Sequence, residues 1–397
     1  MNKKNLFKSK RKKKEDEGSD ELSFFAFLKR FFGRFDLFQI IPMFLLLAVG
    51  CLFIYGAGQQ VGGNFAELFW RRQILYAFLG LMIWFVLVFV DYRWLGPLSI
   101  VMYPLTLFGL VYVLLYGVTL SGGKQWIQVA GITVQPSEFA KLALIIAVAW
   151  LLSLEKANIN NIFCLLFILL MTAIPVVLIL KEPDFGTAAV IIPVVGAIAF
   201  VSNLKWRYIL IALIAVAVAA PSIYYQLKPY QKARLVMFLD PEKDPLNRGW
   251  NAIQSEIAVG SGGLLGKGYM QGTHCSLGYL PKTVAHSDFI FPVIAEESGF
   301  VGGLVLLGLF ALLIFSIFRT ALLASDAFGR NLCVGIATLV MVHVFVNIGM
   351  CIRLMPITGL PLPLVSYGGT FLITLLTCLG IVQSVYSHRN TDSFLGV

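Results

Sequence analysis

The chain has 397 residues, of which 58% are hydrophobic and only 13% are charged. This composition excludes an ordinary soluble domain, whose surface needs far more charge, and it indicates a polytopic membrane protein. The net charge of +10 is unevenly placed, because eleven of the 31 Lys and Arg residues precede residue 36.

The chain begins with a charged tail over residues 1–36, in which the basic KKNLFKSKRKKK precedes the acidic EDEGSDE. Such a segment is expected to be disordered. It is either a cytoplasmic flank that orients the first helix and touches anionic lipid, or an arm that binds nucleic acid. We favour the cytoplasmic flank and expect no nucleic-acid partner.

Ten apolar segments follow, each near the ~20 residues that cross a bilayer. We therefore predict an all-α polytopic membrane protein of about ten transmembrane helices. These form one domain over residues 37–389, followed by a short cytoplasmic tail over 390–397. The segments are 38–56, 73–90, 96–118, 137–154, 162–180, 185–201, 208–225, 289–318, 331–351 and 367–386.

The basic flanks set the predicted orientation. With the Lys-rich tail in the cytoplasm, an even number of spans returns the C-terminus to the same side. The large loop over residues 226–288, between the seventh and eighth helices, then lies on the extracytoplasmic face. Its length, its amphipathic pieces and its glycine cluster at 260–268 predict a functional element.

The motif QPSEFAK lies on that same side in this topology. Pro136 and Glu138 suit the first turn of a helix, where a carboxylate interacts favourably with the helix dipole. Lys141 lies deeper on the same face, where an unpaired ammonium is costly. An ordinary helix start and an ion pair facing a polar cavity both fit the motif, and Lys141 favours the ion pair.

Two further segments on that side each have two interpretations. Trp126, in GGKQWI, is either an interfacial aromatic residue or a wall against a sugar or lipid chain. The segment PLPLVSYGG is either a helix-to-loop corner or backbone that lines a cavity. In the second case Ser366 and Tyr367 offer hydrogen bonds to a ligand.

Carboxylates occur at the start of the eighth apolar segment, in HSDFIFPVIAEESG. Asp288 is either a helix N-cap or a general base at the membrane surface. Glu296 and Glu297 cap nothing; we expect one to bind a cation or orient a partner and the other to pair with a basic residue. The residues alone predict a polar cavity of mixed charge at the outer surface and name no reaction.

These motifs resemble those of the SEDS family (shape, elongation, division and sporulation), in particular its RodA branch, from about residue 37 to 389. The matching motifs, in order, are GGKQWI, QPSEFAK, KEPDFGTA, FLDPEKDP with NAIQSEIAVGSGGLLGKG, HSDFIFPVIAEESG and PLPLVSYGG. The sequence departs from the family before Asp288, where LPKTVAHSDF has about two extra residues and Ser287 replaces a threonine. His274 and Cys275 are also unusual, and we assign them no role.

The resemblance implies a peptidoglycan glycosyltransferase of the bacterial plasma membrane that serves cell elongation and shape. It would polymerise lipid II into glycan strands with inversion, and release undecaprenyl diphosphate. The implied partners are lipid II, the undecaprenyl-diphosphate-linked glycan, membrane lipids, a class B penicillin-binding protein and other elongation-complex proteins. A lipid II flippase, a division-type polymerase like FtsW and a scaffold for the cell-wall machinery remain alternatives.

The resemblance also implies roles for individual residues. Asp288 matches the essential aspartate and is the expected catalytic base. The leaving diphosphate would be neutralised by Lys141, Arg234 and Arg353, or by a divalent cation, Mg²⁺ or Mn²⁺, and we expect no other cofactor. The complete set of predicted substrate-binding residues is Trp126, Glu138, Lys141, Lys232, Arg234, His286, Glu296, Glu297, Arg353 and Ser366.

Overall fold

The structure is a computed structural model that describes residues 33–61, 64–120, 123–129, 132–226, 232, 238, 240, 249–281 and 284–389. The predictions made for residues 1–32, for residues 390–397 and for Arg234 lie outside these residues.

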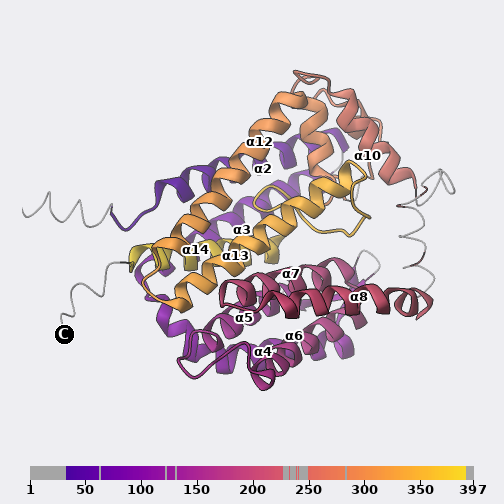
Figure 1. Cartoon of the computed structure of the whole chain (residues 1–397). Coiled ribbons are helices and arrows are strands. Elements are labelled where there is room, and N and C mark those ends of the chain that lie inside the picture. Colours follow the sequence, from indigo (N-terminus) through magenta and orange to yellow (C-terminus); the bar gives the residue numbers. More distant parts are fainter. Residues whose placement is uncertain are drawn as a thin grey trace, which may run out of the picture.

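Helices dominate the described chain (Figure 1), and each of the ten predicted apolar segments coincides with one of them. The predicted class, a helical polytopic membrane protein, is therefore confirmed. In chain order the ten are α2 (Leu37–Val61), α3 (Asn64–Phe89), α4 (Leu95–Tyr116), α5 (Pro136–Leu151), α6 (Ile162–Lys181), α7 (Phe185–Val201), α8 (Trp206–Gln226), α12 (Ile290–Leu323), α13 (Ala327–Cys351) and α14 (Gly369–Ser387). Shorter helices between them are η1 (Tyr92–Trp94), α10 (Trp250–Ser261) and α11 (Thr273–Ser276).

Seven of the described helices are long and apolar enough by themselves to cross a membrane: α2, α3, η1 with α4, α6, α12, α13 and α14. The most apolar windows of α13 and α14 are 83% buried, whereas those of α4 and α6 are only 22% and 17% buried. The bundle therefore has α13 and α14 at its centre and α4 and α6 at its lipid-facing edge. Helix α5 has only 16 residues and is almost wholly buried among the other helices.

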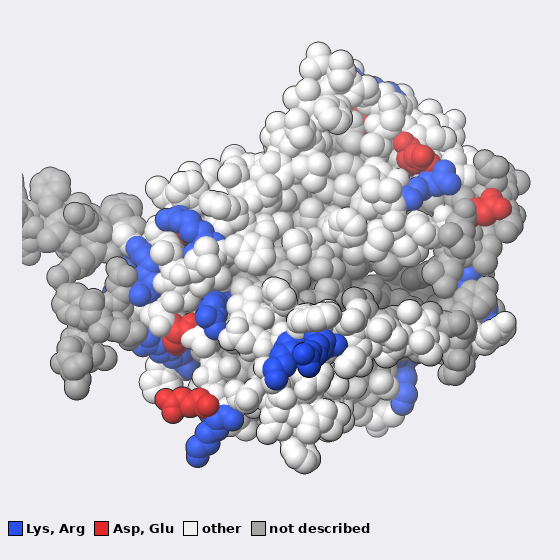
Figure 2. Space-filling model, in the orientation of Figure 1, with Lys and Arg blue, Asp and Glu red and all other residues white. Residues whose placement is uncertain are grey.

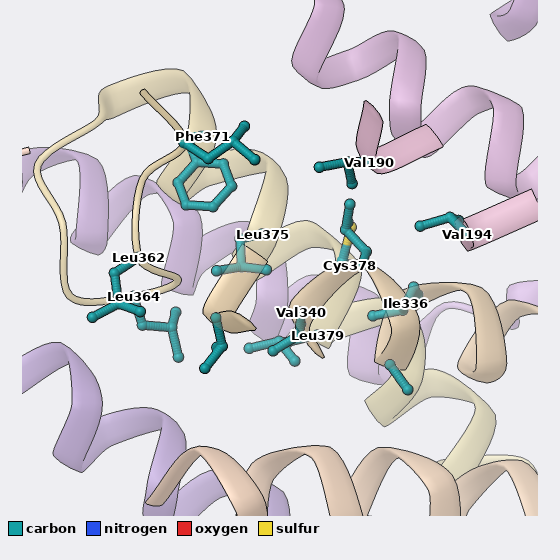
Figure 3. Packing of buried hydrophobic residues seen from close by; sticks show 14 of the residues in the cluster. Val190, Val194, Ile336, Val340, Leu362, Leu364, Phe371, Leu375, Cys378 and Leu379 are labelled. Carbon is teal, nitrogen blue, oxygen red and sulfur yellow. The ribbon is translucent and has the colours of Figure 1, made fainter. Parts of the chain in front are cut away.

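The helices pack against one another in the bundle shown in Figure 1. Helix α14 lies against α3, α13 lies against α12, α7 and α5, and α12 also contacts α2. Buried side chains of α7, α13 and α14 meet in the core, among them Val190, Val340 and Leu375 (Figure 3). Because lipid is as apolar as leucine, close packing holds such helices together more than removal from water does.

The surface agrees with a membrane location. On the face shown in Figure 2, several Lys and Arg side chains gather at the left, beside both ends of the described chain. Most of the remaining face is uncharged. Apolar side chains such as Phe108, Phe163 and Phe315 are more than half exposed, as lipid-facing residues are.

A small antiparallel sheet occupies the segment that the sequence predicted only as a loop. It has the order β1 (Val118–Leu120), β2 (Gly123–Val129) and β3 (Ile132–Val134). The Lys124 ammonium donates hydrogen bonds to the carbonyls of Leu114 (3.0 Å) and Leu115 (2.9 Å). Those carbonyls belong to the last turn of α4, where a helix lacks partners of its own and favours a cation.

The eighth predicted segment, 289–318, is two helices joined at a break in α12. Gly299 has φ 69° and ψ −166°, which is not helical. Residues 290–297 are buried in the protein, whereas Phe300, Val301 and Leu304 are exposed. The part that faces lipid is thus 300–323, which at 1.5 Å per residue is about 36 Å long and sufficient to cross a bilayer.

Candidate active site

Three helices, α5, α7 and α14, begin at one end of the bundle, and polar groups at their starts connect them. The Gln135 amide donates to Asp184 Oδ2 at the start of α7 (3.2 Å). Thr370 Oγ1, at the start of α14, accepts from the Gln135 backbone N–H (3.3 Å) and donates to the carbonyl of Thr133 in β3 (3.2 Å). The motifs around residues 126, 138, 184 and 369 are therefore neighbours, although the chain separates them widely.

Asp288 lies in the turn that precedes α12 and is partly exposed. The N-cap of α12 is Phe289, which makes no side-chain cap, so the interpretation of Asp288 as a simple N-cap is not supported. A Cβ added at Gly359 would lie 3.4 Å from Asp288 Oδ2, which places the loop 353–369 directly beside this carboxylate.

Asn347 of α13 fixes that arrangement, and the sequence did not identify it. Its amide donates to the carbonyls of Asp288 (3.1 Å) and Leu360 (2.7 Å). One buried side chain thus ties the turn before α12 to the loop 353–369. The only signal in the sequence is an amide within an otherwise apolar helix, where an unpaired polar group is costly.

Ser366 also connects the turn before α12 to the loop 353–369. Its hydroxyl donates to the carbonyl of Ser287 (2.6 Å) and accepts from the backbone N–H of Leu362 (2.8 Å). The side chain is 1% exposed. Its single proton is therefore used inside the protein, which makes Ser366 a structural element of the loop in this conformation.

His286 stacks on Phe69, with ring centroids 4.1 Å apart, and its ring also meets that of Tyr367 at 5.3 Å. Burial lowers the pKa of His286 to about 4, so the imidazole is neutral at pH 7. A neutral, stacked ring can shape the wall beside Asp288 but supplies no positive charge there.

Glu138 and Lys141 form the predicted ion pair. Lys141 Nζ lies 2.9 Å from Glu138 Oε1, and both residues are buried. Among the residues that the structure describes, a cavity of about 10 Å³ touches Lys141. Its other lining residues are apolar: Leu144, Ile145, Val190, Ile191, Val194 and Leu339.

A third residue completes this pair. His343 of α13 places Nε2 3.2 Å from Lys141 Nζ, and its Nδ1 lies 3.3 Å from the carbonyl oxygen of Pro361. The ring of Phe371 covers both the imidazole and the ammonium. His343 was not among the residues predicted from the sequence, since a single histidine in an apolar helix carries no spacing signal.

The tight KEPD hairpin between α6 and α7 contains two acids with different surroundings. Asp184 caps α7, because its Oδ1 accepts from the Thr187 backbone N–H (3.0 Å). Glu182 is fully buried, and within the described chain neither carboxylate oxygen has a hydrogen-bond partner. Burial, together with the nearby charge of Asp184, raises the pKa of Glu182 to about 8.

Glu296 and Glu297 attach the connection between α10 and α11 to the break in α12. Glu296 Oε1 accepts from Lys267 Nζ (2.6 Å) and from the Thr273 backbone N–H (2.9 Å). It also lies 2.9 Å from Nδ1 of His274, which gives that histidine a structural contact. Glu297 accepts from the Gln60 amide (2.6 Å) and the Met270 backbone N–H (3.0 Å). The prediction that one acid pairs with a basic residue is confirmed for Glu296.

Three further predicted substrate-binding residues contact other parts of the chain. Arg353 pairs with Glu256 of α10 (2.7 Å), and both side chains are exposed. Lys232 donates to the Tyr225 carbonyl (3.1 Å). Trp126 lies on β2 opposite Val118 and is partly buried.

The predicted divalent cation has no pre-formed site of protein side chains among the residues that the structure describes. Among them, no group of three or more His, Cys, Asp or Glu side chains is arranged to hold a metal ion.

Comparison with known proteins gives one consistent result. Residues 37–391 match the model of the FtsW, RodA and SpoVE family, described as cell cycle protein. The chain is similar to peptidoglycan glycosyltransferase MrdB of Escherichia coli K12, with 38% identity covering 88% of this chain and 93% of MrdB.

Two solved structures are also similar. A chain of a peptidoglycan synthase complex that coordinates polymerization and crosslinking has a TM-score of 0.76 and 34% identity. It covers 90% of this chain and 99% of its own length. The rod shape determining protein RodA of Thermus thermophilus has a TM-score of 0.67 and 30% identity, covering 90% of this chain and 98% of RodA.

Proposed function

Because the chain belongs to the FtsW, RodA and SpoVE family, we propose that it polymerises lipid II into the glycan strands of peptidoglycan for cell elongation and shape. The predicted enzyme class is confirmed, since the similar MrdB is a peptidoglycan glycosyltransferase. The observation that best supports the proposed mechanism is the position of Asp288. Its carboxylate is partly exposed in the turn before α12, beside Gly359 of the loop 353–369, and Asn347 holds its backbone carbonyl.

In the proposed reaction, the 4-hydroxyl oxygen of one sugar forms a bond to the anomeric carbon of another. The bond from that carbon to undecaprenyl diphosphate breaks, and the configuration inverts. Asp288 accepts the proton of the attacking hydroxyl, a step for which general-base catalysis typically contributes 10²–10⁴-fold.

The departing diphosphate carries the charge that develops in the transition state, so cations near it accelerate the reaction. We assign this role to Lys141 and Arg234, with Arg353 able to join them by exchanging its exposed pairing with Glu256. Glu138 holds Lys141 in place. Trp126, Lys232, His286 and the other predicted substrate-binding residues form the surrounding walls and supports.

We place the protein in the bacterial inner membrane, with both termini cytoplasmic and the site on the extracytoplasmic face. Basic side chains gather beside the ends of the described chain, which supports this orientation (Figure 2). A class B penicillin-binding protein is the proposed partner, because a similar chain belongs to a synthase complex that couples polymerization to crosslinking.

The test is a polymerisation assay with purified protein, its transpeptidase and lipid II, with and without Mg²⁺ or Mn²⁺. We expect Asp288→Asn to lower the rate at least about 100-fold. Ser287→Ala is the matched control, because the Ser287 hydroxyl makes only a 3.3 Å contact with Val284 within its own turn. Full activity of Asp288→Asn at equal membrane level would refute the assignment of the base.

The same assay separates the alternatives. A flippase would move labelled lipid II across vesicles without forming glycan, and a scaffold would do neither. A division-type role would appear as loss of septation, with elongation intact, when the chain is depleted.

A further inference from the structure

His343 lies in a buried network with Glu138 and Lys141. The carbonyl oxygen of Pro361, 3.3 Å from Nδ1, can only accept a hydrogen bond. Nδ1 must therefore carry the ring proton. The ammonium of Lys141, 3.2 Å from Nε2, can only donate. Nε2 is consequently an unprotonated acceptor, and the two contacts together determine one neutral tautomer.

We propose that His343 is a positioning residue for Lys141. Two of the three N–H bonds of the ammonium point at fixed acceptors, Glu138 Oε1 and His343 Nε2. Because the ammonium is tetrahedral, fixing two N–H directions also fixes the third. Phe371, labelled in Figure 3, restricts the head group further from its ring face, 5.6 Å away. His343 thus keeps the Lys141 ammonium oriented.

The proposal also links the ammonium to the loop beside Asp288. Pro361 holds His343, while Gly359 and Leu360 of the same loop adjoin Asp288 and Asn347. A shift of the loop would therefore move the base and the orientation of Lys141 together. This inference rests on the proposed role of Lys141 in the reaction.

The test compares His343→Gln, whose amide oxygen can replace Nε2 as acceptor, with His343→Leu, which has no acceptor. Thr338→Val is the control on the same helix, because the Thr338 hydroxyl donates only to the Val334 carbonyl of its own turn. We expect kcat to fall about tenfold in His343→Leu and to recover in His343→Gln. The KM for lipid II should change much less than kcat, because His343→Leu removes one acceptor from the Lys141 ammonium and leaves the other predicted substrate-binding residues in place.

The results distinguish a failure of the proposed role of His343 from a failure of the proposed role of Lys141. If His343→Leu retains the wild-type kcat per folded molecule and only the folded amount falls, the positioning role is refuted. If Lys141→Ala itself retains full activity, the proposed function of Lys141 fails, whatever the result at position 343. A lower kcat per folded molecule with a nearly unchanged KM, and recovery in His343→Gln, supports the proposal, since partial unfolding alone would reduce the amount of active enzyme and leave its kcat unchanged.

A turn at residues 262–266 follows α10 and precedes α11. The backbone N–H groups of Phe300 and Val301 donate to the carbonyls of Gly263 (2.8 Å) and Leu264 (3.1 Å). The turn is therefore attached at the point where the lipid-facing part of α12 begins. The side chains of Leu264 and Leu265 are 73% and 81% exposed.

We infer that Leu264 and Leu265 insert into the bilayer. Phe300, the first residue of the lipid-facing part of α12, is 65% exposed, so the apolar surface of the turn continues that of the helix. Two adjacent leucines this exposed would be unfavourable in water, and hydrocarbon at the edge of a membrane-crossing helix is the matching environment.

Spin labels test this inference in vesicles of phosphatidylethanolamine and phosphatidylglycerol. Nitroxides are placed at position 265, at Leu304 as the lipid reference and at exposed Ser276 as the aqueous reference. The partly exposed Cys51 and Cys164 are replaced by alanine. We expect position 265 to be accessible to oxygen, as Leu304 is. Access to a water-soluble nickel chelate, as at Ser276, or shielding from both reagents by a protein neighbour would overturn the inference.

Discussion

Glu182 shows how one buried carboxylate makes stability depend on pH. Its pKa is about 8 in the folded protein and about 4.5 in an unfolded chain. Since the folded state prefers the protonated acid, the contribution of Glu182 to stability is fully present below pH 4.5 and is lost as the pH rises through 8.

We expect Glu182→Gln, which mimics the protonated acid, to match the wild type at pH 5 and to melt at a higher temperature at pH 9. Between pH 4.5 and pH 8, the free energy of unfolding of Glu182→Gln should exceed that of the wild type by at most about 1.4 kcal/mol for each pH unit. Thermal unfolding in detergent at both pH values measures it. Glu155→Gln, at an exposed connection, is the control and should show no such difference. If the melting temperatures of wild type and Glu182→Gln changed equally with pH, the raised pKa of Glu182 would be contradicted.

The residues of the site differ in how far the sequence could identify them. Asp288, Glu138 and Lys141 belong to motifs that point to chemistry before any coordinates are known. Asn347 and His343 are single polar residues in an apolar helix. Their partners are the carbonyls of Asp288, Leu360 and Pro361 and the Lys141 ammonium, which only the packing of α5, α13 and the loop brings close.

At the scale of elements, the break in α12 depends on glycine. Gly299 has a positive φ of 69°, and a Cβ there would lie 2.2 Å from the Gly266 backbone nitrogen. The second glycine, Gly266, has φ 80°, and a Cβ there would lie 2.1 Å from the Glu297 carbonyl oxygen. The two segments therefore meet backbone to backbone, and side chains would separate them.

We expect Gly299→Ala to lower the free energy of unfolding by more than about 2 kcal/mol. Its backbone lies in a region that almost only glycine adopts, which alone costs ~1–3 kcal/mol for another residue, and the contact with Gly266 adds to that cost. Gly303→Ala, on the same helix, is the matched control, because no atom lies within 4 Å of its added Cβ. That change should be neutral or stabilising by up to ~1 kcal/mol. Equal melting temperatures of the two variants would show that the break does not need glycine.

At the scale of the whole molecule, Arg319 joins three helices at the end opposite the site. Its guanidinium lies 3.1 Å from Asp36 Oδ1 before α2, and over the rings of Phe38 (4.9 Å) and Tyr386 (5.8 Å). Asp36 is only 1% exposed. Burial raises its pKa, and the charge of Arg319 opposes that rise.

We expect Arg319→Leu to destabilise the bundle at pH 8 by less than the ~3–5 kcal/mol of a fully buried pair, since Arg319 is one-third exposed. Removing the cation raises the pKa of Asp36 further, so protonation at pH 5 should reduce the defect. Arg319→Lys keeps the charge and should lose much less. The free energies of unfolding of wild type, Arg319→Leu and Arg319→Lys are measured at pH 5 and pH 8. If Arg319→Leu were destabilised equally at both pH values, the pairing of Arg319 with Asp36 would be contradicted.

The sequence by itself determined the membrane class, the ten apolar helices and the motifs of the site. Hydrocarbon imposes length and composition on every helix, so these features can be seen along the chain. Only the tertiary structure showed the break at Gly299, the small sheet, and the contacts of Asn347 and His343. Such features depend on which backbone groups meet across the bundle, and apolar helices that lipid surrounds carry little sequence pattern for their mutual contacts.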